Sequence, residues 1–187
     1  MANSNTPNGF TPAYHQSGGT IRSKEGRVLE ASATIFSGDL VKIDGAGNVI
    51  PAAAGDACVG AFAGCEYIAG DGSIEFKQSW VNGTPIQADS AIKAYYYDDA
   101  NIIYTAQFAG ASGRAVMGGL FLIDVAAGGT AANGRSLDEI GAADAGGPLR
   151  LLDFVEMDDN DSEQDNASAY VMIAEHQYAV SVISAAI

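Results

Sequence analysis

The sequence predicts an all-β protein with little helix. Apolar residues make up 48% of its 187 residues, but 23 glycines and other turn residues divide them into short runs. In "LVKIDGAGNVI" (40–50), two apolar runs flank a glycine-rich turn, which is typical of a β-hairpin. In "SIEFKQSW" (73–80), the even positions Ile74, Phe76, Gln78 and Trp80 share one face and the polar residues at odd positions share the other, which is the period of a strand. We therefore expect a compact β-sandwich or barrel-like domain, because the chain has the length of one domain.

The first twenty residues predict an extended N-terminal arm. Residues 1–20, "MANSNTPNGFTPAYHQSGGT", hold two prolines, three glycines and many Asn, Ser and Thr residues, with few apolar anchors. Such a segment is typically disordered alone and ordered against a partner. Phe10 and Tyr14 are the anchors we expect to dock.

The remainder, residues 21–187, is expected to form one β-rich domain. The apolar run Leu120–Ile123 predicts a strand buried on both faces. Residues 126–149 are rich in Gly and Ala and predict a long loop, with at most one helical turn at 136–141. Two more strands are expected, one within 149–157 and a last one within 168–182.

Two features near the C-terminus are unusual in composition. Carboxylates crowd the segment 156–166, which is either a solvated acidic turn or a loose calcium site. An EF-hand starting at Asp158 is excluded, because Glu163 and Ala169 stand where that loop needs Gly and Glu. The apolar tail "VISAAI" (182–187) predicts burial against the protein itself or a neighbouring subunit.

The charge distribution argues against nucleic acid as a partner. The formal net charge is −14, with 23 acidic and nine basic residues, so a phosphate backbone would be repelled. Arg22, Lys24 and Arg27 form the one basic cluster in the sequence. No apolar stretch approaches 18 residues and "MANSNTPNGF" lacks the pattern of a signal peptide, so we expect neither secretion nor membrane insertion.

The two cysteines, Cys58 and Cys65, leave several interpretations open. Their spacing misses the C-x-x-C pattern, and a zinc site would need both histidines, His15 and His176, to converge with them. A disulfide would need the intervening residues to turn back, and a nucleophilic cysteine would need a histidine base. The sequence favours thiols that pack as small hydrophobic groups. We expect no catalytic, cofactor-binding or metal-binding residues, because no motif for them is present.

The triplet Tyr95-Tyr96-Tyr97 could present rings to a sugar or a protein. In a strand, however, Tyr95 and Tyr97 would face one side and Tyr96 the other. The simpler interpretation is therefore one buried face with hydroxyl groups at its rim.

The order of these features resembles the head decoration, or cement, proteins of tailed bacteriophages. The resemblance is carried by the glycine frame from Gly38 to Gly64, by "KAYYYDD" (93–99) and by "AEHQY" (174–178), so it covers most of the chain. It implies a non-enzymatic β-rich protein on the outer surface of the virion. Such proteins are made in the host bacterial cytoplasm and stabilise the capsid by clamping neighbouring major capsid proteins, usually as trimers; here a dimer is also possible.

Within this resemblance, an arm of this kind would add a strand to the capsid, and the basic cluster would steer it. The residues expected to contact the capsid are Phe10, Tyr14, Ile21, Arg22, Lys24 and Arg27. Those expected to contact other copies or surface ligands are Trp80, Tyr95, Tyr96 and Tyr97. Two alternatives remain. One is a virion-surface adhesion or carbohydrate-binding module that uses the tyrosines, Trp80 and the acidic turn, and the other is a hydrolase that uses Cys58 or Cys65.

Overall fold

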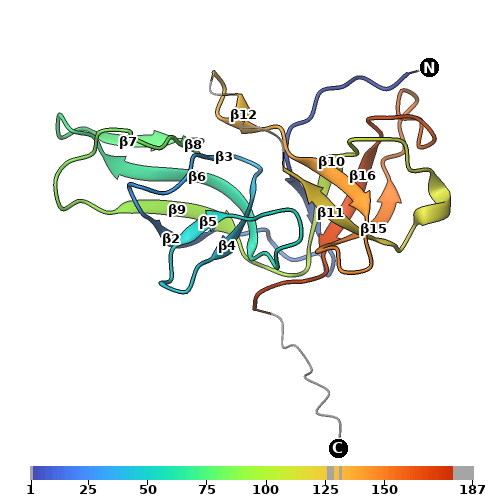
Figure 1. Cartoon of the computed structure of the whole chain (residues 1–187), viewed down its shortest axis with the longest axis horizontal. Helices are drawn as coiled ribbons and strands as arrows, with labels where there is room; N and C mark the ends of the chain where they lie inside the picture. The colour runs from blue at the N-terminus through green and yellow to red at the C-terminus, as the bar shows by residue number, and fades with distance from the viewer. Residues whose placement is uncertain (1, 126–128, 131, 179–187) are drawn as a thin grey trace, which may run out of the picture.

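The computed structural model describes residues 2–125, 129–130 and 132–178. Within these ranges the regular elements are strands and one short 3-10 turn, η1 (Arg114–Val116), so the all-β prediction is confirmed. Figure 1 shows two lobes of strands side by side, the left one blue to green and the right one largely yellow to red. Each lobe is a small barrel.

The first barrel has five strands in the order β2-β9-β6-β4-β5, and every neighbouring pair is antiparallel. A parallel bridge between Arg27 and Asn48 joins the two ends of this order and closes the ring. The hairpin predicted over 40–50 is confirmed as β4 and β5. The strands are β2 (Lys24–Val28), β4 (Leu40–Ile43), β5 (Val49–Pro51), β6 (Gly60–Ile68) and β9 (Ile92–Tyr97).

The second barrel also has five strands, in the order β10-β16-β15-β11-β14. Its neighbouring pairs are antiparallel as well. A parallel bridge between Phe108 and Ile140 closes this ring. The strands are β10 (Ile102–Gln107), β11 (Leu120–Asp124), β14 (Glu139–Ala143), β15 (Leu149–Phe154) and β16 (Ser168–Ile173).

The two barrels have the same strand order. When the strands of each are numbered along the chain, both orders read 1-5-4-2-3. In both rings, the closing parallel bridge joins one of the first and third strands to the residue adjoining the other. The sequence shows no corresponding repeat. Strand order depends on where the turns fall and which face is apolar, and neither needs identical residues.

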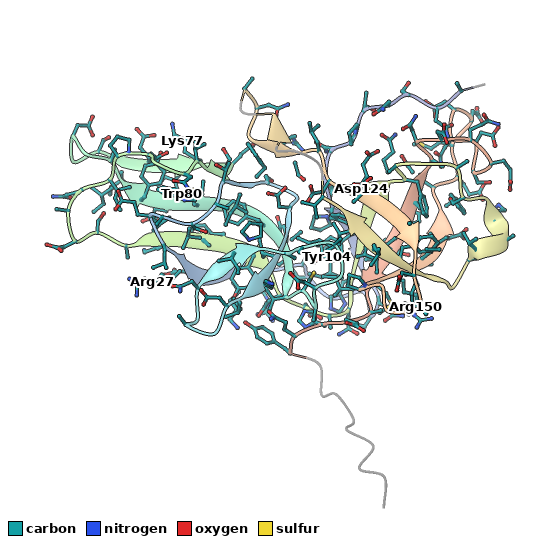
Figure 2. All side chains as sticks on the ribbon, viewed as in Figure 1. Arg27, Lys77, Trp80, Tyr104, Asp124 and Arg150 are labelled. Atoms are coloured by element: carbon teal, nitrogen blue, oxygen red, sulfur yellow. The ribbon has the colours of Figure 1, made fainter. Side chains whose placement is uncertain are left out.

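Each barrel has an apolar core, and the core of the second extends into the first. Trp80 and Tyr96 are buried inside the first barrel. The larger cluster contains Tyr104 of the second barrel together with Leu40 and Cys58 of the first, and Tyr104 lies between the lobes in Figure 2. Each large apolar side chain contributes about 1.5–3 kcal/mol when fully buried. The shared cluster therefore ties the barrels to each other.

Accessory strands extend this scaffold. The edge strand β1 (Thr11–His15) pairs with β10, and β7 (Ile74–Lys77) pairs with β6. Two short antiparallel pairs form separate sheets: β3 (Ile35–Phe36) with β8 (Ser79–Trp80), and β12 (Gly129–Thr130) with β13 (Arg135–Ser136). The side chains of Ile35 and Trp80 still belong to the core of the first barrel.

Residues 1–20 do not form the separate arm that the composition predicted. Strand β1 is an edge strand of the second barrel's sheet, and its partner β10 lies far along the chain. Phe10, just before β1, is completely buried in the larger cluster. The prediction was wrong because one large apolar residue and main-chain pairing were enough to hold this segment on its own protein.

The predicted loop over 126–149 contains three strands instead, β12, β13 and β14. No helical turn forms at 136–141, since Ser136 ends β13 and Glu139 begins β14. The alternation signal was absent because Ile140 is the single large apolar residue in β14. Pairing with β11 fixes this strand through main-chain hydrogen bonds, which any sequence can make.

The run Leu120–Ile123 forms β11 as predicted, although Leu120 and Leu122 are half-buried and only Phe121 and Ile123 are buried. The strand predicted within 149–157 is confirmed as β15. The last predicted strand, 168–182, ends earlier, because β16 stops at Ile173. The tail 182–187 lies outside the described residues.

Candidate interaction surface

The two barrels are joined by segments that cross from one to the other. The backbone N–H of Phe10 donates to the carbonyl of Gly38, which lies just before β4 (2.8 Å). The N–H of Ser136 donates to the carbonyl of Ser37 (2.9 Å), so β13 of the second half lies beside β3 of the first. The N-terminal segment, the turn before β4 and the segment around Ser136 therefore meet at one place.

Gly9 shows how closely these segments approach. Its φ of +64° is a conformation that favours glycine. A Cβ atom at this position would lie 2.5 Å from the Cβ of Ser136 and 2.8 Å from the carbonyl oxygen of Gly38. The side chain of Asp39 is buried here and accepts the N–H of Phe36 (2.7 Å), and burial raises the pKa of this carboxyl. Only glycine fits this crossing.

A second connection is made by residues 174–178, the "AEHQY" stretch. The N–H of Cys58 donates to the carbonyl of Glu175 (3.0 Å), and the N–H of Gln177 donates to the carbonyl of Cys58 (2.9 Å). The side-chain amide of Gln177 accepts the N–H of Ile43 (2.7 Å) and donates to its carbonyl (3.2 Å). His176 is buried, and this burial lowers the pKa of its imidazole. We call residues 174–178 the junction clip.

Both cysteines are buried and free, as the packing interpretation predicted. Cys58 belongs to the cluster shared by the barrels and Cys65 to the core of the first barrel. Burial raises the pKa of each thiol to about 12, so both remain protonated at neutral pH. Neither position therefore supplies an activated thiolate.

The aromatic residues proposed for surface contact are mostly internal. Trp80 is completely buried and packs edge-to-face on Tyr67, with 5.6 Å between the ring centroids. The tyrosine triplet alternates as predicted: Tyr96 is buried, and Tyr95 and Tyr97 are half-buried. The hydroxyl of Tyr95 donates to Glu66 Oε2 (2.9 Å). Trp80 and Tyr96 are thus core residues, which corrects their assignment as surface contacts.

The basic cluster does not form one patch. Lys24 and Arg27 are three residues apart on β2, so their side chains leave opposite faces of the strand. The ammonium of Lys24 lies 3.2 Å from Asp98 Oδ2 and 4.5 Å from the ring centre of Tyr178. The bond to Asp98 raises the pKa of Lys24. Arg22 and Arg27 are exposed.

The three apolar residues predicted to dock also have different environments. Phe10 is buried in the protein's own core, so it is not available to a partner in this structure. Ile21 is partly buried against the same cluster. Tyr14 is 47% exposed on β1 and packs edge-to-face on Tyr170. Among the three, Tyr14 is the one presented to solvent.

The most exposed large apolar side chains lie on β7, which sequence reasoning assigned to a shared face with Trp80. Ile74 is 63% exposed and Phe76 is 69% exposed, whereas Trp80 is buried. The bend at Gln78 separates β7 from β8, so the alternation does not continue across it. The sequence pattern alone could not show that these two apolar residues are exposed, because the bend is a feature of the folded structure.

The acidic turn is held by polar contacts to two distant segments. Asn3 contacts the backbone of Asp161 and Asp165, and Asp165 Oδ1 accepts the N–H of Ala111 (2.7 Å). Arg114 pairs with Glu156 and Asp153. Among the described residues, no group of three or more His, Cys, Asp or Glu side chains is placed to hold a metal ion.

No helix within the described ranges is long and apolar enough to cross a membrane. No family model, curated protein or solved structure matches the chain. The contacts described above are therefore the basis for a functional proposal.

Proposed function

We propose that this protein is a non-enzymatic structural protein that binds the outer surface of a phage capsid and clamps neighbouring major capsid proteins. The proposal begins from the resemblance to decoration proteins in the glycine frame and in the "KAYYYDD" and "AEHQY" stretches. It is supported by what these stretches do: the last of them is the junction clip, and Gly38 lies at the crossing of three segments.

The observation that carries the proposal is the set of three connections between the barrels. A clamp has to resist separation of its two halves when the shell expands. Here the crossing at Gly9 and Gly38, the junction clip and the shared apolar cluster all connect the barrels. Separating them would expose buried apolar side chains and break main-chain hydrogen bonds at several points at once.

The revised contact surface differs from the one that composition suggested. Phe10 serves the fold, so capsid contact falls to exposed groups such as Tyr14, Arg22 and Arg27. The carbohydrate-binding alternative loses support because Trp80 and Tyr96 are buried. The hydrolase alternative loses its nucleophile because both thiols stay protonated.

The test is co-sedimentation of the purified protein with expanded, undecorated heads of its phage, at low and high salt. We expect saturable binding at a fixed ratio to the capsid lattice. Arg22→Glu should weaken binding at low salt, because Arg22 is exposed beside β2. Arg150→Glu on the second barrel is the matched charge reversal and should bind as the unmodified protein does.

Two results would contradict the proposal. Absence of saturable binding at either salt concentration would exclude the capsid as the partner. Equal loss of binding in the Arg22 and Arg150 variants would show a nonspecific effect of net charge, which is already −14.

A further inference from the structure

Strand β7 has an unpaired edge. Its one sheet partner among the described strands is β6, in the register Cys65–Lys77 to Ile68–Ile74. The N–H of Ala69 donates to the carbonyl of Ser73, just beyond this ladder. Because backbone groups alternate in direction along a strand, Ser73, Glu75 and Lys77 direct theirs to β6. The backbone groups of Ile74 and Phe76 point away from it, toward the open edge.

The same two residues expose their side chains. Ile74 and Phe76 stand opposite Ile68 and Glu66 of β6, on the outer face of the first barrel, whereas the neighbouring Tyr67 points into the core. In Figure 1, β7 lies at the outer margin of the first lobe, and Figure 2 places Lys77 on the same margin. An edge strand with exposed apolar residues is the type of site to which another strand adds.

We propose that β7 pairs with β7 of a second copy of this chain, antiparallel, with the two-fold axis through Phe76. This register puts the two Phe76 side chains opposite each other. It also puts Glu75 of each copy opposite Lys77 of the other, so that two opposite-charge pairs form across the interface. Aromatic and opposite-charge cross-strand pairs both stabilise antiparallel strands.

The charges on β7 select this register over its neighbours. Moving the two-fold axis to Glu75 would place two glutamates opposite each other, and moving it to Lys77 would place two lysines opposite each other. Like charges directly opposite are destabilising. Within one copy, Glu75 and Lys77 already pair at 2.8 Å, so the dimer would alternate four charges on one face.

The pairing would join the two first barrels through one continuous sheet, β9-β6-β7 of each copy. The second barrels would stay at the far ends and keep their surfaces free. This inference does not depend on capsid binding, because self-pairing is a property of the isolated protein. We expect a second copy of the chain, rather than another protein, at the open edge of β7 because the charge pattern of this strand is complementary to itself.

The first test measures self-association by sedimentation equilibrium over a range of protein concentrations. The unmodified protein should show a monomer–dimer equilibrium. Glu75→Lys should raise its dissociation constant about tenfold or more, since both charge pairs become repulsive. The double reversal Glu75→Lys/Lys77→Glu restores opposite charges in the same register and should restore the dimer.

Phe76→Asp should abolish association, whereas Met157→Asp, on an exposed apolar residue of the acidic turn, should leave it unchanged. Thermal melting of each variant separates loss of the dimer from loss of the fold. A protein that stays monomeric at every concentration would overturn the proposal. So would a dimer that responds equally to Phe76→Asp and Met157→Asp, or that the double reversal fails to restore.

The second test uses disulfide cross-linking. Phe76→Cys would place two cysteines opposite each other in a hydrogen-bonded pair, at a Cα separation of about 5.5 Å, which a disulfide can span. The native thiols are buried and should not interfere. We expect a covalent dimer under mild oxidation, and none from Met117→Cys, an exposed position on the second barrel. Equal cross-linking at both positions would overturn the proposed register.

Discussion

The two barrels share one strand order but use their accessory strands differently. In the first, β7 extends β6 outward and leaves Ile74 and Phe76 exposed. In the second, β1 extends β10, and the adjoining Phe10 enters the shared core. The added strand β1 therefore completes the fold of the second barrel, whereas β7 leaves an open strand edge on the first barrel. The same scaffold can carry a structural and an interactive role, depending on where its large apolar residues point.

The strongest test of this contrast removes the side chain that completes the second barrel. Phe10→Ala should lower the free energy of unfolding by about 3–5 kcal/mol, because it leaves a cavity in a packed core. Urea unfolding should be followed by circular dichroism and by the fluorescence of Trp80, the single tryptophan, which reports on the first barrel.

The barrels share a core, so both signals should shift together in this variant. A shift in circular dichroism with an unchanged Trp80 transition would show that the barrels unfold independently. The contrast between a structural β1 and an interactive β7 would then apply to two separate folding units.

The crossing of segments can be tested at a glycine. Gly9→Ala should destabilise the protein by about 1–3 kcal/mol, because Gly9 has a positive φ and faces Ser136 and Gly38 at close range. Gly18→Ala is the control: Gly18 also has a positive φ, but no atom lies within 4 Å of the added Cβ. Denaturant midpoints of the two variants should differ, and equal midpoints would contradict the close crossing.

The junction clip predicts a pH dependence. Burial lowers the pKa of His176 in the folded state below its ordinary value of 6.5, so the unfolded chain binds this proton first as the pH falls. The stability contributed by neutral His176 is therefore fully present above pH 6.5 and is lost as the pH falls from there toward the lowered pKa. The slope for one group is at most about 1.4 kcal/mol per pH unit.

His176→Gln should show a smaller loss of stability between pH 7 and pH 5 than the unmodified protein. Thermal melting at a series of pH values would measure it. The carboxyl of Asp99, whose pKa is lowered to about 2 by its bonds to Asn101 and His15, contributes stability that is lost only at lower pH. If the variant loses as much stability as the unmodified protein over this pH range, then the titration of His176 does not cause the pH dependence.

The smallest expected effect is at the exposed surface of β1. Tyr14→Ala removes an edge-to-face contact with Tyr170 and should cost about 0.5–1.5 kcal/mol, well below Phe10→Ala. Chemical denaturation of both variants under one condition makes the comparison. A loss as large as that of Phe10→Ala would mean that β1 is held by its outer face rather than by the core.

The sequence predicted what depends on local pattern. The hairpin over 40–50 and the alternation of Tyr95 to Tyr97 follow from turn residues and period-2 burial, and both are confirmed. The apolar run Leu120–Ile123 correctly predicted a strand, but one face of that strand is only half-buried. The packing role of the cysteines followed from their small apolar neighbours.

What the sequence did not predict depends on long-range pairing. Strand β14 carries one large apolar residue and is fixed by β11, and Phe10 is buried in a cluster whose members lie mostly beyond Ile102. The exposed face of β7 was missed because the bend at Gln78 interrupts the alternation that would have placed Trp80 on the same face as Ile74 and Phe76. Such features arise from which strands meet, and no local pattern encodes that choice.

The pairing of β1 with β10 also has a consequence for synthesis. Strand β1 leaves the ribosome early, yet its partner begins at Ile102, roughly 90 residues later, so at 5–20 residues per second β1 waits on the order of ten seconds. During that interval Phe10 lacks most of the cluster that buries it. The nascent chain therefore exposes an unpaired strand and an aromatic side chain, which makes the first half of translation the period of greatest exposure to misassembly or chaperone capture.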